Sequence, residues 1–293
     1  MHGNNLDIEL NNGVKIPPIM LGTYAINKNK AVEALQFAYE AGFRGIDCAR
    51  YYKNEHDWGK AIAKLNISRS DIFIQTKVDF TREYSKLDVI SDFELTQNNF
   101  RTHYIDALLI HFPVGNRFLE TWADMEKLYR AGKVRAIGVC NFRPEHFEML
   151  KKTATIVPMI NQFERHPCRK QNEILDYCFT NHIQPQAYSP LAVCNPKLLY
   201  NPVLLEIAKK YHCTSAQVSL AWNICSGVIP LPRSKSKTNI SANAKALDIC
   251  LTERDMEEIN GIDAYCRALN EARECPGYWD IIHRVDESEY LGI

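Results

Sequence analysis

The chain has 293 residues, of which 46% are hydrophobic and 24% are charged, as is usual for a globular protein with a substantial core. Its 35 basic and 35 acidic side chains leave no net charge, which argues against nucleic acid or an anionic membrane as a partner. Ten cysteines are scattered without the spacing of a zinc motif or a disulfide framework, so no metal is expected. No segment approaches the ~20 apolar residues of a membrane span, and the sequence predicts a soluble cytoplasmic protein without a targeting signal.

The first predicted elements are a hairpin and a strand followed by a helix. Residues 6–10 and 14–19 are predicted strands, and the Asn-Gly sequence between them favours a tight turn, giving an N-terminal hairpin over 6–19. Residues 19–23 form the next strand. Four apolar residues then recur at helical spacing before a glycine, which is favoured just after a helix: Ala31, Ala34, Leu35, Ala38 and Gly42.

Seven further apolar runs alternate with amphipathic helical stretches as far as about residue 250. They are 45–48, 72–78, 105–112, 136–140, 158–163, 184–188 and 228–231. Eight buried strands separated by helices predict an α/β fold, a (β/α)₈ TIM barrel in one domain spanning 1–293. A doubly wound sheet is the alternative, although no Gly-x-Gly-x-x-Gly follows a strand.

Four polar side chains fall at or just after the ends of three successive barrel strands. Asp47 ends the second strand and Tyr52 follows it, while Lys77 and His111 lie near the ends of the third and fourth. Active sites of such barrels lie at the carboxyl ends of the strands, so these residues are expected to meet. A phenol of pKa near ~10 donates a proton more readily beside a cation, which Lys77 can supply. Asp47 would hold that ammonium, and His111 would orient a substrate carbonyl.

Each of these residues taken alone also has a structural interpretation. Lys77 can extend from a buried strand to solvent, and Asp47 can cap a helix or turn. His111 can be a histidine at a strand end whose hydrogen bonds are satisfied within the structure. Their joint placement favours a functional site. Two other functions stay open: a barrel aldolase that uses Lys77 as a Schiff-base amine, and a cofactor-binding regulatory or sensor protein.

Five separated blocks resemble the aldo-keto reductase family, of the aldose and xylose reductase type, and occur in the family's order. They are 45–55 (GIDCARYYKNE), 109–113 (LIHFP), 132–142 (GKVRAIGVCNF), Asn161-Gln162 with His166-Pro167, and 187–191 (AYSPL). The resemblance covers roughly residues 6 to 260. It implies a barrel that binds NADPH across its mouth and reduces aldehydes or ketones, with Asp47, Tyr52, Lys77 and His111 as the catalytic residues.

The resemblance also assigns residues to the cofactor. Asn141 and Gln162 would hydrogen-bond the nicotinamide carboxamide, and Tyr188 would stack on the ring and fix its orientation. Cys140 replaces the usual serine before the asparagine and is a weaker hydrogen-bond donor. The other implied contacts, to ribose, pyrophosphate and adenine, are Gly22, Thr23, Asp47, Ser189, Leu191, Arg233, Ser234, Lys235, Asn239 and Asn243.

The adenine end departs from the family pattern. Arg233 and Lys235 retain partners for a 2′-phosphate and favour NADPH. Asn239 and Ala242 stand where an arginine and a glutamate are usual, which leaves use of NADH open.

The substrate end is implied to include Tyr24, Tyr51, Asp79, His111 and Phe112. Tyr24 and Asp79 occupy positions where many relatives have tryptophan, which predicts a more polar pocket for a sugar or another small hydroxylated carbonyl. The C-terminal tail, about 262–293, is expected near the active site, where Trp279 either closes the pocket or packs on the barrel. The expected partner is a small carbonyl substrate, and the chain is expected to be a monomer or weak dimer.

Overall fold

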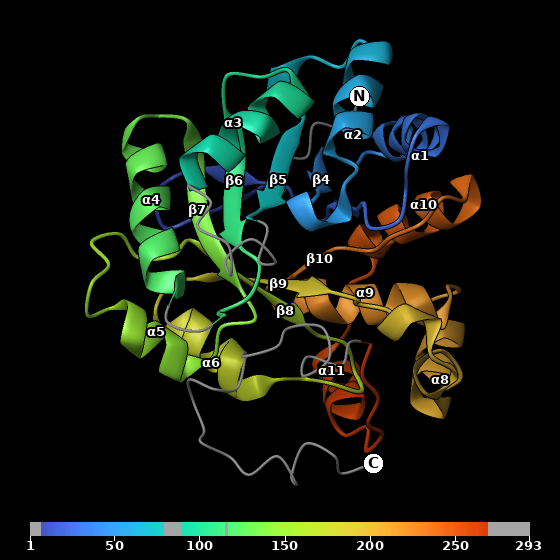
Figure 1. Cartoon of the computed structure of the whole chain (residues 1–293). Coiled ribbons are helices and arrows are strands. Elements are labelled where there is room, and N and C mark those ends of the chain that lie inside the picture. Colours follow the sequence, from blue (N-terminus) through green and yellow to red (C-terminus); the bar gives the residue numbers. More distant parts are fainter. Residues whose placement is uncertain (1–6, 79–88, 115–116, 269–293) are drawn as a thin grey trace, which may run out of the picture.

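The computed structural model describes residues 7–78, 89–114 and 117–268 (Figure 1). In this part of the chain, eight parallel strands follow one another in chain order around one sheet. They are β3 (Leu21–Gly22), β4 (Gly45–Asp47), β5 (Phe73–Lys77), β6 (Ile105–Ile110), β7 (Val134–Cys140), β8 (Ile160–Glu164), β9 (Gln184–Tyr188) and β10 (Ile229–Pro230). Each overlaps one of the eight strands that the sequence predicts.

The sheet closes into a barrel because the first strand, β3, is hydrogen-bonded to the last strand, β10, and to the residues that follow it. Met20 donates its backbone N–H to the Pro230 carbonyl (3.3 Å), and Gly22 donates to the Pro232 carbonyl (3.0 Å). A doubly wound sheet would reverse its strand order at a switch point, whereas here the order runs unbroken from β3 to β10. The (β/α)₈ barrel is therefore confirmed, and the doubly wound alternative is wrong.

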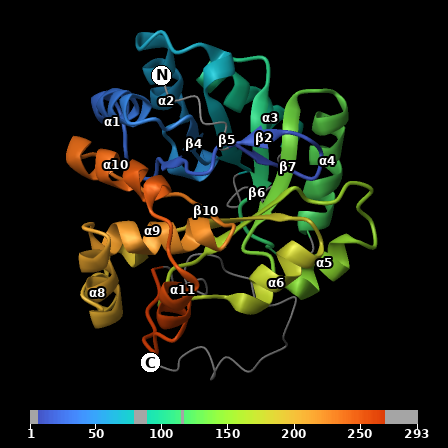
Figure 2. The ribbon, with the colours of Figure 1, turned by 180° about the vertical axis from the view of Figure 1, so that it is seen from behind.

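Helices form the outer layer around the strands, as Figure 1 and the reverse view in Figure 2 show. None of the helices in the described residues is long and apolar enough to cross a membrane. The α-helices are α1 (Asn29–Glu40), α2 (Glu55–Lys64), α3 (Val89–Phe100), α4 (Phe118–Arg130), α5 (Pro144–Leu150), α6 (Asn172–Thr180), α7 (Pro196–Leu199), α8 (Pro202–Lys210), α9 (Ser215–Cys225), α10 (Lys237–Ala244) and α11 (Glu253–Asn260). Short 3₁₀ turns are η1 (Arg50–Tyr52), η2 (Arg69–Asp71), η4 (Ala192–Cys194) and η5 (Lys245–Asp248).

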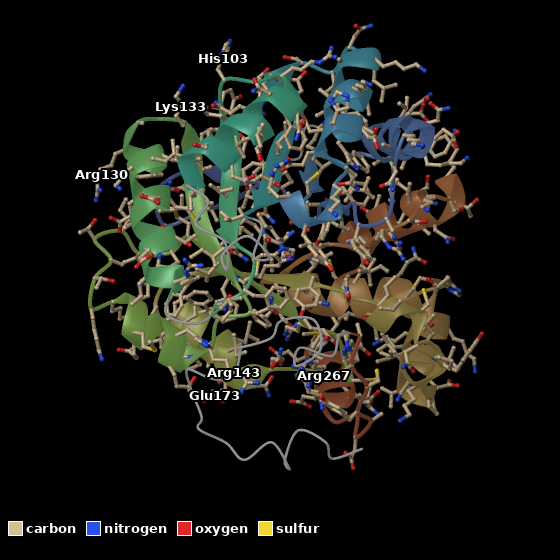
Figure 3. All side chains as sticks on the ribbon, viewed as in Figure 1. His103, Arg130, Lys133, Arg143, Glu173 and Arg267 are labelled. Atoms are coloured by element: carbon tan, nitrogen blue, oxygen red, sulfur yellow. The ribbon has the colours of Figure 1, made fainter. Side chains whose placement is uncertain are left out.

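The apolar core consists of two clusters. The larger fills the barrel and the space beneath α1 to α6 and α10, and it contains Trp58. The smaller lies among α8, α9 and α11 and contains Trp222. Polar side chains at the outer rim, such as His103, Arg130 and Lys133, are exposed and point away from the sheet (Figure 3).

Helix α1 follows the predicted pattern closely. Its four predicted apolar positions, Ala31, Ala34, Leu35 and Ala38, are all buried. Gly42, just beyond the helix end, has a φ of +98°, in the left-handed region that favours glycine. Helical spacing and the terminal glycine thus set both the buried face of the helix and the point where it ends.

The N-terminal hairpin of β1 (Ile8–Glu9) and β2 (Lys15–Ile16) is also confirmed. Its turn residue Asn11 donates to the carbonyls of Pro158 (3.2 Å) and His182 (3.1 Å), and Asn12 donates to the Arg135 carbonyl (2.9 Å). These acceptors lie where β7, β8 and β9 begin, so the hairpin covers the amino end of the barrel. In the described residues, the hairpin leaves the carboxyl end of the barrel uncovered.

Replacing Gly59 of α2 by alanine is expected to destabilise the protein. A Cβ on Gly59 would overlap the backbone carbonyl of Asn99 in α3, so the two helices would have to separate. Overpacking of this kind typically costs about 1–3 kcal/mol, more than the gain in helix propensity. Gly261→Ala is the control, because its nearest neighbours lie at an ordinary 3.4 Å. Thermal unfolding of both variants should show a lower Tm for Gly59→Ala alone, and equal Tm values would contradict the close approach of α2 and α3.

Candidate active site

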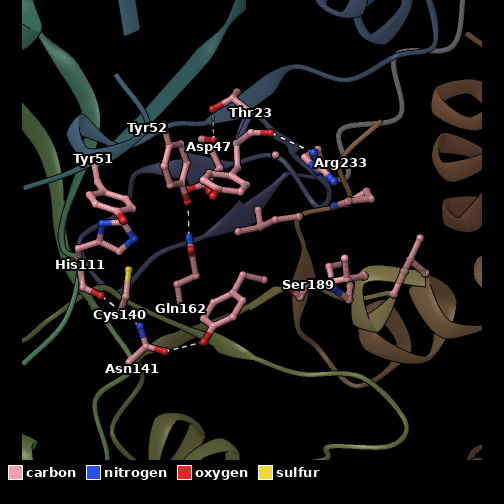
Figure 4. Close-up of a pocket in the computed structure, with 18 of the residues that line it drawn as sticks. Thr23, Asp47, Tyr51, Tyr52, His111, Cys140, Asn141, Gln162, Ser189 and Arg233 are labelled. Atoms are coloured by element: carbon pink, nitrogen blue, oxygen red, sulfur yellow. Dashed lines mark hydrogen bonds between the residues drawn. The ribbon is translucent and has the colours of Figure 1, made fainter. Parts of the chain in front are cut away.

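A pocket of about 410 Å³ lies at the carboxyl end of the barrel (Figure 4). Its walls come from the ends of the strands and from the loops that follow them. The predicted site residues that line it are Gly22, Thr23, Tyr24, Asp47, Tyr51, Tyr52, His111, Phe112, Cys140, Asn141, Gln162, Tyr188, Ser189, Leu191 and Arg233. Residues more than a hundred positions apart in the sequence therefore meet at this mouth.

Lys77 lies beneath the pocket, and its ammonium group makes three hydrogen bonds. Its Nζ donates to both carboxylate oxygens of Asp47, each at 2.7 Å, and to the Cys48 carbonyl at 2.8 Å. The Lys77 side chain is 1% exposed and that of Asp47 is 5% exposed. A buried ion pair with this many hydrogen bonds is held in one geometry, because breaking it would leave an uncompensated charge in the core.

Tyr52 lies beside this ion pair, at the end of η1. Its ring centroid lies 5.2 Å from Lys77 Nζ, 5.8 Å from the His111 ring and 5.1 Å from the Tyr24 ring. The predicted set of Asp47, Tyr52, Lys77 and His111 is thus brought together, with Asp47, Tyr52 and His111 lining the pocket and Lys77 behind them.

The electrostatics of this group keep Tyr52 protonated at neutral pH. Burial raises the pKa of its phenol, while the Lys77 ammonium acts in the opposite direction. For Lys77, burial is the largest single effect and lowers the pKa, but Asp47, together with Tyr52 and Cys140, raises it by more, so the pKa is raised. The phenol therefore carries a proton, and a charged lysine lies close enough to stabilise the phenolate that would remain after donation.

His111 is a neutral imidazole at neutral pH. Burial, followed by the nearby Lys77 charge, holds its pKa well below the ordinary value. Its ring stacks on Phe112 with centroids 5.1 Å apart and meets Tyr51 edge-on at 6.2 Å. A neutral ring fixed between aromatic side chains can orient a polar group in the pocket, but it does not supply a positive charge.

Amide side chains and a tyrosine form another wall of the pocket. Asn141 has a φ of 62°, in the left-handed region, and its Nδ2 donates to the His111 carbonyl at 3.1 Å. The Tyr188 hydroxyl donates to Asn141 Oδ1 at 3.0 Å, and Gln162 Nε2 donates to Asp47 Oδ1 at 3.0 Å (Figure 4). A flat aromatic face beside two amide groups matches a nicotinamide ring with its carboxamide, so these residues fit a nicotinamide cofactor.

Burial also raises the pKa of the Cys140 thiol next to this wall. The thiol therefore stays protonated at neutral pH and takes the small volume expected of the serine it replaces. Its side chain lines the pocket without adding a charge.

Two buried glutamines under the pocket escaped the sequence prediction. Gln75 Nε2 donates to Asp47 Oδ1 at 2.7 Å and to Gln186 Oε1 at 2.8 Å, and Gln186 Nε2 returns a bond to Gln75 Oε1 at 3.0 Å. Both lie two residues before a predicted site residue, Lys77 or Tyr188, on the same strand. The period of two in a strand places them on the same inward face, so this spacing could have identified them.

The loop after β9 supplies a wall that the sequence predicts only in part. Besides Ser189 and Leu191, it contributes Val193 and Cys194, whose φ values of 54° and 60° lie in the left-handed region. Non-glycine residues rarely adopt this conformation, and such strain concentrates at ligand-binding loops. Residues after β10 complete the wall, and there Arg233 donates to the Tyr24 carbonyl at 3.3 Å.

In the described part of the chain, four residues that the resemblance assigns to the cofactor do not line the pocket. They are Ser234, Lys235, Asn239 and Asn243. Ser234 accepts the Ser236 backbone N–H, and Ser236 caps the start of α10, on which Asn239 and Asn243 lie. Two other predicted residues, Asp79 and Trp279, lie outside the described residues.

The sequence and the fold both have clear relatives. Residues 18–264 match the model of the Aldo/keto reductase family. Glyoxal reductase of Bacillus subtilis (strain 168) is 39% identical over 87% of this chain and 92% of its own length, and methylglyoxal reductase DkgA of Escherichia coli (strain K12) is 33% identical over 87% and 93%. The crystal structure of an aldo/keto reductase from Brucella melitensis superposes with a TM-score of 0.82 at 36% identity, covering 88% of this chain and 99% of the other. The chain belongs to the aldo/keto reductase family.

Proposed function

We propose that this chain reduces small 2-oxoaldehydes such as glyoxal and methylglyoxal, taking the hydride from NADPH and the proton from Tyr52. Family membership makes it an oxidoreductase that acts on aldehydes and ketones. The observation that carries the proposed mechanism is the contact of the Tyr52 ring with the buried Lys77–Asp47 pair. The names of two relatives, glyoxal reductase and methylglyoxal reductase, support the substrate class.

In this proposal each member of the group has one task. Tyr52 donates its phenolic proton to the carbonyl oxygen of the substrate as negative charge develops there. Lys77 stabilises the phenolate, and Asp47 keeps that lysine charged and in place. His111, which is neutral, orients the carbonyl oxygen toward the phenol. Reprotonation of Tyr52 from solvent completes the cycle.

The same pocket would hold the cofactor. Asn141 and Gln162 would bind the carboxamide, Tyr188 would cover one face of the ring, and Arg233 would hold a phosphate. Bound NADPH supplies the hydride. A volume of about 410 Å³ shared between a nicotinamide ring and a substrate leaves room for a small carbonyl compound.

The aldolase alternative does not fit the environment of Lys77. A Schiff-base amine has to be neutral and accessible to the substrate carbonyl. Lys77 instead makes three hydrogen bonds to Asp47 and Cys48, its pKa is raised, and it does not line the pocket. The sensor alternative is not favoured either, because the relatives are reductases.

We also propose that the chain works as a monomer or weak dimer. The cysteines of the described residues are free thiols, which supports a reducing, cytoplasmic location.

Steady-state kinetics with NADPH test the substrate class. We expect kcat/KM for glyoxal and methylglyoxal to exceed that for an aldose such as xylose by at least about tenfold, because the small pocket favours compact substrates. An aldose turned over as well as methylglyoxal would contradict the proposed class and favour the hydroxylated substrates that the sequence suggests.

The preference for NADPH depends in this proposal on Arg233. Arg233→Ala is expected to raise KM for NADPH by about tenfold and to leave KM for NADH nearly unchanged, because a guanidinium contact to the additional phosphate is lost. Arg254→Ala on α11 is the control, since that side chain is 86% exposed and pairs with Glu258. Equal effects on the two cofactors, or a strong NADH preference of the native chain, would contradict the assignment.

A further inference from the structure

Three side chains that commonly bind metals come together outside the pocket. The ligand atoms of His166, Cys168 and Cys266 all lie within 4.8 Å of one another. Their exposed fractions are 0%, 4% and 7%, and none of the three lines the pocket. The spacing of the cysteines predicts no such group, because Cys266 lies far along the chain, beyond α11, and only the fold brings it to the other two.

The backbone around this group is well fixed. A tight turn holds His166 and Cys168 on one side: the Arg169 N–H donates to the His166 carbonyl at 2.7 Å. The segment that carries Cys266 is anchored at both ends. Lys170 Nζ donates to the Ile262 carbonyl at 2.8 Å, and the Ala268 N–H donates to Glu164 Oε1 at 2.7 Å. Cys266 is therefore held against the turn.

One ring nitrogen of His166 has no hydrogen-bond partner in the described residues. Its Nε2 lies 3.1 Å from Glu164 Oε1, and both side chains are fully buried. A carboxylate can only accept, so Nε2 carries the ring proton and a lone pair remains on Nδ1. In the described part of the chain, the buried Nδ1 has no hydrogen-bond partner. A buried polar atom without a partner is unfavourable, and a histidine oriented by a carboxylate on its other nitrogen is the arrangement typical of metal ligands.

We propose that His166 Nδ1, Cys168 Sγ and Cys266 Sγ bind one thiophilic divalent cation of the Zn²⁺ class. The two thiols release their protons to solvent as the two metal–sulfur bonds form, and the imidazole adds a metal–nitrogen bond. A fourth ligand from solvent completes a tetrahedron. Two thiolates balance the charge of the cation, so the loaded site is neutral and suits a buried position.

The distances are compatible with this coordination. Two sulfurs on one tetrahedral Zn²⁺ lie roughly 3.7 Å apart, since each bond is ~2.3 Å long. Donor atoms that are now within 4.8 Å need to approach by about 1 Å, which side-chain rotation can provide. Metal binding would tie residues 262–268 to the turn after β8, and it is independent of the proposed reductase activity.

Co²⁺ is the probe, added to the full-length chain after chelation and reduction with a phosphine. We expect one Co²⁺ per chain, with a sulfur-to-cobalt charge-transfer band and the strong visible bands of four-coordinate cobalt, both displaced by one equivalent of Zn²⁺. Zn²⁺ should also raise the Tm, because the ion binds only the folded chain.

Variants locate the site. Cys168→Ser and Cys266→Ser should each abolish the charge-transfer band, while Cys250→Ser, at an exposed cysteine, should leave it intact. Glu164→Gln should weaken Co²⁺ affinity by about 10–100-fold without changing the spectrum, as expected of a residue that orients a ligand. Circular dichroism and Tm check that each variant folds, and Cys266→Ala provides a second variant where serine destabilises the buried position.

Three results would overturn the proposal. The first is the absence of stoichiometric Co²⁺ or Zn²⁺ binding by the folded, reduced chain. The second is binding that persists unchanged in both Cys168→Ser and Cys266→Ser. The third is a Cys168–Cys266 disulfide that forms in air, with no metal bound once it is reduced again, which would identify the pair as a redox couple instead.

Discussion

Replacing Tyr52 by phenylalanine is expected to lower kcat for methylglyoxal reduction by about 10²–10⁴-fold, the usual contribution of a positioned proton donor. The change removes one hydroxyl and keeps the ring that contacts Lys77, His111 and Tyr24. The Kd for NADPH, measured by fluorescence titration, should change by less than about twofold, because the cofactor residues are elsewhere in the pocket. The loss should therefore fall on kcat rather than on cofactor binding.

Tyr39→Phe is the matched control for this experiment. Tyr39 lies on α1, outside the pocket, with the Arg44 guanidinium over its ring. It should retain native kcat. If Tyr52→Phe kept near-native kcat while it bound NADPH normally, the proton donor would have to be a different residue.

Changes at Lys77 and Asp47 are expected to shift the pH dependence of reduction in opposite directions. Reduction needs a protonated Tyr52, so the rate falls as pH rises through the pKa of that phenol. The Lys77 charge lowers this pKa. In Lys77→Met the pKa therefore rises, the alkaline limb of kcat moves to higher pH, and kcat falls by on the order of 10²-fold because the phenolate is no longer stabilised.

In Asp47→Asn the signs reverse. The Asp47 carboxylate raises the pKa of Tyr52 and also that of Lys77, so both pKa values fall when it becomes neutral. Lys77, left to the effect of burial, loses its proton at lower pH, and the alkaline limb of kcat moves to lower pH. The measurement is kcat against pH for both variants, with Tm recorded to confirm folding. If the alkaline limb of kcat moved in the same direction in Lys77→Met and in Asp47→Asn, the assigned interactions would be contradicted.

Much of the barrel could be predicted because its strands are short, buried and separated by helices. Hydrophobic runs place β4, β5, β6 and β9 almost to the residue, and Gly42 fixes the end of α1. Site residues at strand ends follow from the same reasoning, since parallel strands share one carboxyl edge. The proximity of Tyr52 and His111 could therefore be predicted without any knowledge of side-chain packing.

Contacts between distant strands and loops could not be predicted in this way. The Gln75–Gln186 pair beneath Asp47 joins strands on opposite sides of the barrel. The left-handed conformation at Val193 is not predicted either, because no glycine occupies that position. The approach of Cys266 to Cys168 depends on where α11 packs. Each of these depends on tertiary structure, which no local pattern encodes.

The most direct test of the proposed function follows the hydride itself. Methylglyoxal is reduced by the native chain with NADPH deuterated at the transferred position, and the product is examined by mass spectrometry and NMR. We expect one deuterium on the former carbonyl carbon for each NADPH consumed, and almost no product from Tyr52→Phe in the same time. Product without deuterium, or no consumption of NADPH with any aldehyde or ketone, would contradict hydride transfer in this pocket.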